Sequence, residues 1–290
     1  MTMLAAPPPP PRATPPKPAP KPPAKPNRVV SLRERKPIAP KIVLAAVEGF
    51  GKTTFGAHAP SPFILMARGE TGYDTLLSAG RVPQVPAALS ESWSETLEWV
   101  ESLIADPQGV KTMVLDAFTG FERLCHEHVC VRDFGGEWGE RGFNGFKRGL
   151  DNALSDWIGL LNRLSTLNER HGVSIVLLSH VKITMFKNPM GMDYSQFAPD
   201  GNDKAWAATA RWADVMLFGN YLTIVDGKAT QKMGKGIGGT DRVIYTERRD
   251  SFVAKNRYGL PPELLLPNDP SAMWSTVWDL IAAGAARSES

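Results

Sequence analysis

The sequence predicts an α/β fold in which a mostly parallel central sheet is flanked by helices and extended by antiparallel strands near the C-terminus. Short β-rich apolar runs alternate with helical stretches from Lys41 onward, which is the pattern of parallel strands joined by crossover helices. A glycine-containing loop joins the first such run to the first helix. After Trp212 the helical patterns give way to consecutive strand-like runs, which favours a meander.

The elements follow from these patterns in order. Parallel strands are predicted at residues 42–46, 62–67, 112–116 and 173–179. Helices are predicted at residues 52–59, 93–105, 118–132 and 150–170, with a last amphipathic helix at about 272–283. The C-terminal meander is predicted at residues 215–221, 222–225, 242–247 and 251–255. Two long loops remain, at residues 134–148 and 182–204.

Length and composition suggest one domain with a tail. The chain has 290 residues, of which 42% are hydrophobic and 22% are charged, enough for one sizeable core. Residues 1–39 are dominated by Pro, Ala, Lys and Arg, so they cannot bury enough apolar surface to offset the entropy of ordering. We expect a disordered Pro-rich basic arm at residues 1–39 and a single folded domain at residues 40–290.

Charge and cysteine content limit the functional classes. A good part of the net charge of +3 lies in the predicted arm, so it argues only weakly for nucleic acid. The two cysteines, Cys125 and Cys130, cannot make a disulfide framework and fit a reducing compartment. The N-terminus lacks a secretory pattern, and no apolar run approaches the roughly 18 residues that span a bilayer. We expect a soluble cytoplasmic protein without a membrane partner.

The connection between the first strand and the first helix predicts a phosphate site. It has the sequence AVEGFGKTT over residues 46–54, and backbone N–H groups of such a loop converge on one spot that favours an anion. Lys52 is expected to reach the β- and γ-phosphates, and the Thr53 hydroxyl to hold Mg²⁺. The motif GxxxxGK[ST] begins with glycine, but Ala46 stands here. The alternative is a glycine-rich turn whose lysine has no part in phosphate binding.

A second strand supplies the matching carboxylate. Residues 112–115 are apolar or β-branched and lead to Asp116, where a buried strand delivers one carboxylate at its tip, as a Mg²⁺ site requires. We therefore expect ATP as the nucleotide and Mg²⁺ held by Thr53 and Asp116. The predicted nucleotide-binding residues are Val47, Glu48, Gly49, Phe50, Gly51, Lys52, Thr53, Thr54 and Asp116.

These motifs and three further strings resemble those of RecA-like P-loop ATPases. The strings are FILMARGE at residues 63–70, VLLSH at residues 176–180 and KNRYG at residues 255–259. The resemblance covers roughly residues 41–262 and is closest to core-only phage ATPases, AAA-type nucleotide-binding proteins implicated in single-strand annealing and recombination. It implies a RecA-like ATPase domain at residues 40–290 and, for a phage protein, the cytoplasm of the bacterial host.

The resemblance also implies catalytic roles beside that of Lys52. Glu70 matches the carboxylate that activates the attacking water, and His180 matches a polar sensor on the strand between the two nucleotide-binding strands. Lys255 and Arg257 match residues that reach across a subunit interface to a neighbour's γ-phosphate. The alternatives are a helix-capping or surface carboxylate for Glu70 and a solvated strand end for the basic pair.

The two long loops lie where RecA proteins place their DNA-contacting loops. Both combine glycine, cationic and aromatic residues, which are typical of single-strand binding and also occur in protein interfaces. The resemblance implies single-stranded DNA and a homo-oligomer, ring or filament, as partners, with a single-strand-binding protein as a further candidate.

The function expected from these observations is ATP-dependent binding of single-stranded DNA that promotes annealing or strand pairing in phage-type homologous recombination. Hydrolysis is expected to be stimulated by DNA and to depend on oligomerisation. Three alternatives stay open: a P-loop kinase of small molecules, which needs phosphate-binding arginines from its own chain, a nucleotide-regulated assembly factor, and a small DNA motor.

Overall fold

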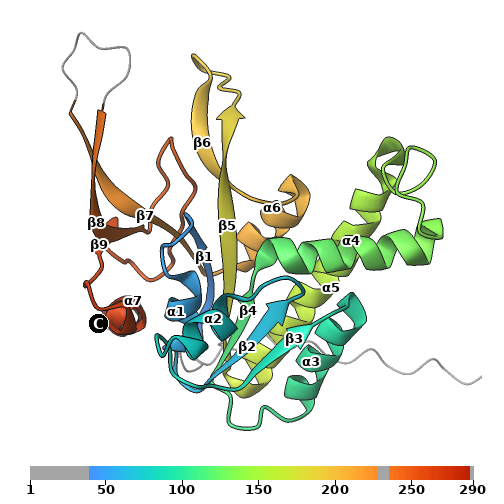
Figure 1. Ribbon diagram of the computed structural model, residues 1–290, viewed down its shortest axis with the longest axis horizontal. Coiled ribbons are helices and arrows are strands. Elements are labelled where there is room, and N and C mark those ends of the chain that lie inside the picture. Colours follow the sequence, from blue (N-terminus) through green and yellow to red (C-terminus); the bar gives the residue numbers. More distant parts are fainter. Residues whose placement is uncertain (1–38, 227–234, 288–290) are drawn as a thin grey trace, which may run out of the picture. The chain divides into compact units, whose positions relative to one another are not determined.

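The computed structural model describes residues 39–226 and 235–287 of the chain (Figure 1). The arm predicted at residues 1–39 lies almost entirely outside the described residues and stays a prediction. From Lys41 strands and helices mostly alternate up to residue 212, and strands then dominate until the last helix. The predicted elements occur in the predicted order, but the helices at residues 72–78 and 203–212 and the strands at residues 87–90, 194–199 and 263–265 were not predicted.

The centre of the domain, as far as the described residues show it, is a nine-stranded sheet with the order β3-β2-β4-β5-β1-β7-β8-β9, and β6 pairs with β5 outside this order. The strands are β1 (Lys41–Ala46), β2 (Pro62–Ala67), β3 (Ala87–Ser90), β4 (Thr112–Asp116), β5 (Ser174–Phe186), β6 (Tyr194–Pro199), β7 (Val215–Asp226), β8 (Lys235–Tyr245) and β9 (Glu263–Leu265). All pairings from β3 to β7 are parallel, whereas β8 and β9 add antiparallel strands. The predicted fold class is therefore confirmed.

Helices cover both faces of this sheet. They are α1 (Lys52–Ala57), α2 (Gly72–Ser78), α3 (Trp93–Ala105), α4 (Phe118–Phe134), α5 (Arg148–His171), α6 (Asp203–Trp212) and α7 (Met273–Arg287). Val43 of β1 belongs to the core beneath α3, α4 and α5, and its neighbours Ile42 and Leu44 belong to the core beneath α1 and α7. Because both faces are covered, the strand is apolar without alternation. Within the described ranges, no helix is long and apolar enough to cross a membrane.

Helix α4 begins very close to the end of β2. A Cβ atom added at Gly120 would lie 2.5 Å from the Cβ of Ala67 and 3.8 Å from Oε1 of Glu70. Only glycine allows this approach without a shift of the helix or the strand. The first turn of α4 thereby packs beside the residues that follow β2.

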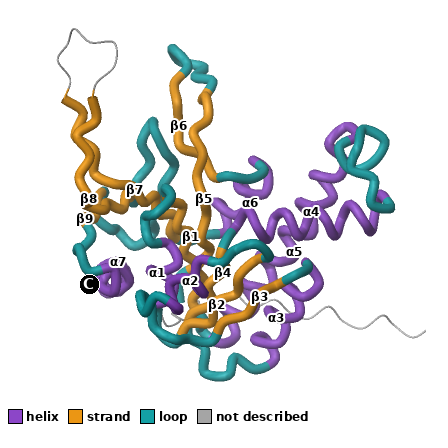
Figure 2. The backbone as a smooth tube through the Cα atoms, viewed as in Figure 1, coloured by secondary structure: helices purple, strands orange, loops and turns teal. Residues whose placement is uncertain are grey.

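The segment predicted as a loop at residues 182–204 is mostly a β-hairpin, so that prediction was wrong. Strand β5 continues to Phe186, past the ends of β4 and β1, and pairs antiparallel with β6 (Figure 2). The continuous buried run ends at Ser179, and beyond it the strand is partly exposed. The predicted end of the strand is the point where burial on both faces ends.

The segment at residues 134–148 is irregular, as predicted, and part of it is packed. Phe143 is buried, with the rings of Phe134 and Trp138 at centroid distances of 6.0 and 4.9 Å. Trp138 is 44% exposed, and Phe146 is 96% exposed with a positive φ of 49°. Of the aromatic residues expected for base stacking, Phe143 is therefore used inside the protein, whereas Trp138 and Phe146 keep exposed surface.

The C-terminal strands differ from prediction in their bounds. The two strands predicted at residues 215–221 and 222–225 form one strand, β7, with a register shift between Tyr221 and Thr223. Residues 251–255, predicted as a strand, form only isolated bridges such as Met216 with Lys255. The break at Tyr221 was a β-bulge in the structure, which a periodicity argument treats as a strand end.

Glu122 of α4 binds the chain segment that follows the β5–β6 hairpin. Its side chain is buried, and both carboxylate oxygens lie 3.0 Å from the N–H of Asn202, which donates to them just before α6. The hydroxyl of Thr119 donates to the carbonyl of Asp200 in the same segment. Burial raises the pKa of Glu122 from 4.5 to about 7. The ionised form of this carboxyl is therefore disfavoured in the folded protein.

Replacing Glu122 with glutamine should stabilise the protein at pH 8 and leave it unchanged at pH 4. Because the folded pKa is raised, native stability is fully present below pH 4.5 and is lost as pH rises toward 7. Glutamine keeps an acceptor for Asn202 and cannot ionise, so the expected gain at pH 8 is roughly 1–3 kcal/mol. Urea unfolding at both pH values measures it, with the exposed Glu98→Gln as the control. Equal changes at both pH values would contradict the assignment.

Candidate nucleotide-binding site

The loop between β1 and α1 is held in place by strand β7. Gly49 and Gly51 have φ angles of 71° and 105°, which glycine adopts without steric cost. Phe50 lies between them with its side chain buried against Gly219, where an added Cβ would be 2.6 Å from the ring. The Tyr221 hydroxyl donates to the carbonyl of Gly49 at 2.7 Å. The loop is therefore a fixed cradle of backbone groups.

Ala46 at the start of the loop is accommodated by the same glycine. The Cβ of Ala46 would lie 2.9 Å from a Cβ at position 219, so the two positions cannot both carry side chains without a shift. Gly219 also accepts a hydrogen bond from the N–H of Val47 at 3.2 Å. The absence of the first glycine of the motif is thus compensated on the neighbouring strand.

Lys52 is positioned at the mouth of the loop. Its Nζ donates to the carbonyls of Ala46 at 3.0 Å and Val47 at 3.2 Å. Burial lowers its pKa, while the carboxylates of Asp116, Glu48 and Glu70 act in the opposite direction. An ammonium that is partly desolvated in this way interacts strongly with phosphate charge.

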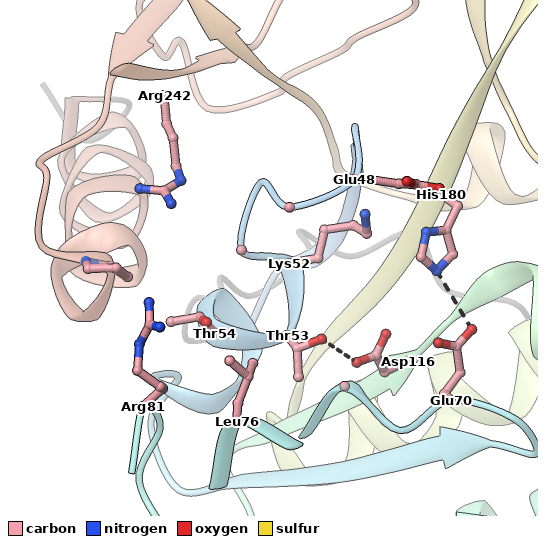
Figure 3. Close-up of a pocket in the computed structure, with 14 residues that line it drawn as sticks. Glu48, Lys52, Thr53, Thr54, Glu70, Leu76, Arg81, Asp116, His180 and Arg242 are labelled. Carbon is pink, nitrogen blue, oxygen red and sulfur yellow. Dashed lines mark hydrogen bonds and ion pairs between the residues drawn. The ribbon is translucent and has the colours of Figure 1, made fainter. Parts of the chain in front are cut away.

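Thr53 and Asp116 form the pair suited to a divalent cation. The hydroxyl of Thr53 donates to Oδ2 of Asp116 at 2.7 Å, which ties the first turn of α1 to the end of β4 (Figure 3). Burial raises the pKa of Asp116. A hydroxyl and a carboxylate are oxygen ligands of the kind that Mg²⁺ takes beside phosphates, and a cation would favour the ionised carboxylate. The residues present therefore fit Mg²⁺.

Glu70 and His180 face each other beyond this pair. Nε2 of His180 is 3.7 Å from Oε1 of Glu70, and the interaction with the imidazole lowers the pKa of Glu70. His180 lies on β5 between β4 and β1, as predicted. Glu70 follows β2 and is fixed by its N–H, which donates to the carbonyl of Ala67 at 2.9 Å. The ionised form of this carboxylate is thus favoured.

These groups share one cavity of about 310 Å³. The predicted residues that line it are Glu48, Gly49, Gly51, Lys52, Thr53, Thr54, Glu70, Asp116 and His180. Val47 and Phe50, also predicted to bind nucleotide, do not line it; Phe50 is turned into the core, so only its backbone can serve the site. Gly72, Leu76, Arg81, Arg242 and Pro270 also line the cavity but were not predicted, because none of them belongs to a motif. Arg81 and Arg242 lie on the side away from Glu70.

Comparison with known proteins agrees with this geometry. A family model described as an AAA domain matches residues 38–258, more than half of the chain. The chain belongs to this family. A search of curated proteins gives no match. Family membership and the cradle around Lys52 together identify an AAA-type P-loop domain that binds nucleotide, in a family whose members are ATPases that generally use ATP with Mg²⁺.

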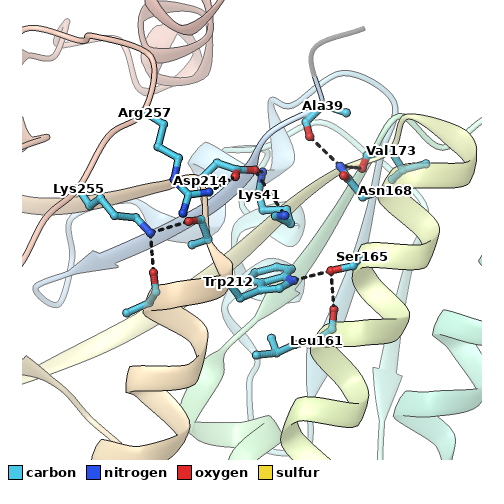
Figure 4. Close-up of polar contacts among 12 residues, drawn as sticks. Ala39, Lys41, Leu161, Ser165, Asn168, Val173, Trp212, Asp214, Lys255 and Arg257 are labelled. Carbon is cyan, nitrogen blue, oxygen red and sulfur yellow. Dashed lines mark hydrogen bonds and ion pairs between the residues drawn. The ribbon is translucent and has the colours of Figure 1, made fainter. Parts of the chain in front are cut away.

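Lys255 and Arg257 lie away from the cavity of this AAA-type domain. Nζ of Lys255 donates to the carbonyls of Ala210 at 2.6 Å and Ala213 at 2.7 Å, at the end of α6, and burial lowers its pKa (Figure 4). Arg257 donates to Oδ1 of Asp214 at 2.9 Å. Both lie near the amino ends of β1 and β7, whereas the cavity lies at the carboxyl end of β1. The fold does not bring them to the site of their own chain.

Replacing His180 with alanine should move the acid limb of ATP hydrolysis to higher pH. The imidazole lowers the pKa of Glu70, so its removal raises that pKa, and the carboxylate that is predicted to accept a proton is then lost at a higher pH. The pH dependence of kcat/KM measures the shift. His128→Ala, which does not line this cavity, serves as the control. An unmoved acid limb in a variant that still turns over would contradict this role of His180.

Proposed function

We propose that this domain hydrolyses ATP and couples hydrolysis to binding of single-stranded DNA, promoting annealing or strand pairing in phage-type homologous recombination. The observation that supports the chemistry is one cavity that joins the loop lysine, the Thr53–Asp116 pair and the Glu70–His180 pair. A cation-binding pair next to an ionised carboxylate is the arrangement that phosphoryl transfer to water requires.

In the proposed reaction Glu70 accepts a proton from a water whose oxygen forms a bond to the γ-phosphorus. The bond from that phosphorus to the β–γ bridging oxygen breaks, and its electron pair leaves with ADP. Lys52 and the backbone N–H groups of the loop bind the phosphates, and Thr53 and Asp116 would hold Mg²⁺, which neutralises charge on the phosphate oxygens. His180 keeps Glu70 ionised and oriented.

A second copy of the chain is proposed to complete the site. Lys255 and Arg257 cannot act on their own cavity, but they can act on that of a neighbour. Lys255 already donates to two carbonyls, whereas the side chain of Arg257 is 56% exposed and pairs only with Asp214 among the described residues. Arg257 is therefore the better candidate for reaching a neighbour's γ-phosphate, as arginine does elsewhere in phosphoryl transfer.

The proposed link to DNA is strand β5. The same strand carries His180 at the cavity and Phe186 at the far part of the hairpin, where the rings of Phe186 and Tyr194 lie 5.1 Å apart. Lys187, which follows Phe186, is exposed. Phe146, in the segment at residues 134–148 between α4 and α5, is exposed as well. Aromatic rings beside cations suit sequence-tolerant binding of single strands.

A small-molecule kinase is the second candidate. Arg81 and Arg242 line the cavity in the same chain, and a kinase needs such arginines to neutralise the transferred phosphoryl group. Glu70 at the opposite end favours water as the nucleophile. The remaining candidates, an assembly factor with negligible turnover and a small DNA motor, differ from the proposal in turnover and in movement along DNA.

ATP hydrolysis measured with and without single-stranded DNA, across protein concentration, tests the proposal. Turnover should rise with DNA and with concentration. It should fall at least about 100-fold in Lys52→Ala, which loses phosphate binding, and strongly in Arg257→Ala, which loses the contact with the neighbour. Arg163→Ala, which removes a partly exposed arginine of α5, serves as the matched control. DNA-independent turnover that Arg257→Ala leaves untouched would remove the shared-site proposal and favour a kinase.

Replacing Glu70 with glutamine separates an enzyme from a switch. Glutamine keeps the shape but cannot accept the proton, so turnover should fall by about 100-fold or more while ATP binding is retained. Equilibrium binding and steady-state hydrolysis are measured on the same preparation, with Glu98→Gln as the control. Full DNA-pairing activity without turnover would support the assembly-factor alternative.

A further inference from the structure

The nucleotide cavity has two chemically different ends. Figure 3 shows Glu70, His180 and Asp116 on one side of Lys52 and Thr53, and Arg81 and Arg242 on the other. A triphosphate whose γ-phosphate meets Glu70 and whose β- and γ-phosphates meet Lys52 must extend away from Glu70. Its sugar and base are thereby directed toward the two arginines.

The second end combines cationic and apolar surface. Arg81 follows α2 and is fixed by its N–H, which donates to the carbonyl of Leu76 at 2.8 Å. Arg242 projects from β8, with its guanidinium 5.8 Å from the centre of the Tyr221 ring. Its Nε is buried and has no hydrogen-bond partner among the described residues. Leu76 and Pro270 add apolar surface to the lining of the same cavity.

The C-terminal segment builds part of this end although the family match stops at residue 258. Pro270 opens a short 3-10 helix (Pro270–Ala272) that leads directly into α7. Sδ of Met273 lies 3.5 Å from the position of a Cβ at Gly51, and the rings of Trp274 and Phe55 are 5.0 Å apart. The segment thus packs against the phosphate loop and α1 as well as lining the cavity.

We propose that Arg81 and Arg242 hold the nucleoside half of the nucleotide against Leu76 and Pro270. Residues 259–287, which supply Pro270, therefore form part of the nucleotide-binding site in this chain. The proposal rests on the nucleotide binding proposed above. Guanidinium planes stack on aromatic bases and donate hydrogen bonds to sugar and base oxygens and nitrogens. Apolar side chains beside them exclude water from the faces of the base.

The test compares MgATP with magnesium tripolyphosphate, which carries the phosphates without the nucleoside. Isothermal titration calorimetry gives both affinities for the full chain and for Arg81→Gln, Arg242→Gln and the double variant. ATP affinity should fall about three- to tenfold in each single variant and further in the double variant, because stacked or hydrogen-bonded guanidinium groups are lost. Tripolyphosphate affinity should stay within about twofold. Arg163→Gln, remote from the cavity, should leave both unchanged.

The outcomes separate this proposal from the one it rests on. Equal losses for ATP and tripolyphosphate would show that the arginines serve the phosphates, which overturns the nucleoside assignment and leaves nucleotide binding standing. Failure of the unaltered chain to bind either ligand would overturn nucleotide binding itself. Unchanged ATP affinity in the double variant would overturn the nucleoside assignment alone.

Hydrogen exchange of residues 259–287 tests the part assigned to the C-terminal segment. ATP should slow amide exchange there, whereas tripolyphosphate should not, because only the nucleoside reaches Pro270. The ATP effect should disappear in Pro270→Gly or Arg242→Gln while protection of the phosphate loop remains. Equal protection of this segment by both ligands would overturn its assignment to the nucleoside.

Discussion

The register of the parallel strands fixes where the strand-borne groups of the nucleotide site lie. Ala46 at the end of β1 is level with His180 on one neighbouring strand and with Gly219 on the other, and Asp116 on β4 is level with Met66 on β2. These strands are buried on both faces, so a slip by one residue would move apolar side chains out of both cores. The sheet therefore sets the positions of Ala46, Asp116 and His180, and the loops supply further groups of the site.

Sequence patterns predicted the elements that are locally determined. The bounds of β2, β4 and α3 agree with prediction because each is an apolar pattern closed by turn or capping residues, such as Ser92, whose side chain accepts the N–H of Glu95. Arg81 and Arg242 could not be predicted to meet, since their proximity depends on the distant pairing of β7 with β8 and on the packing of α2. Non-local contacts leave no periodic signal in the chain.

Strand β5 connects the nucleotide cavity directly to the β5–β6 hairpin. It runs without a break from the core through His180 to Phe186, and its outer part is braced by β6 and by the contacts of Glu122 and Thr119. The nucleotide cavity and the hairpin are therefore joined by continuous strand, with no loop between His180 and Phe186. Of the two segments proposed to contact DNA, the hairpin is the one joined to the cavity in this way.

Ala46 and Gly219 have a consequence for how this loop can evolve. The methyl group of Ala46 occupies part of the space that a side chain at position 219 would need, and the ring of Phe50 occupies the rest of it. Side chains at positions 46 and 219 therefore compete for the same space, although β1 and β7 are far apart in the sequence. Glycine at position 46 would remove one of the two contacts that exclude a side chain at position 219, whereas the contact with Phe50 would remain. Ala46 and Gly219 are thus expected to change together, and only in chains that also reduce the aromatic ring between them.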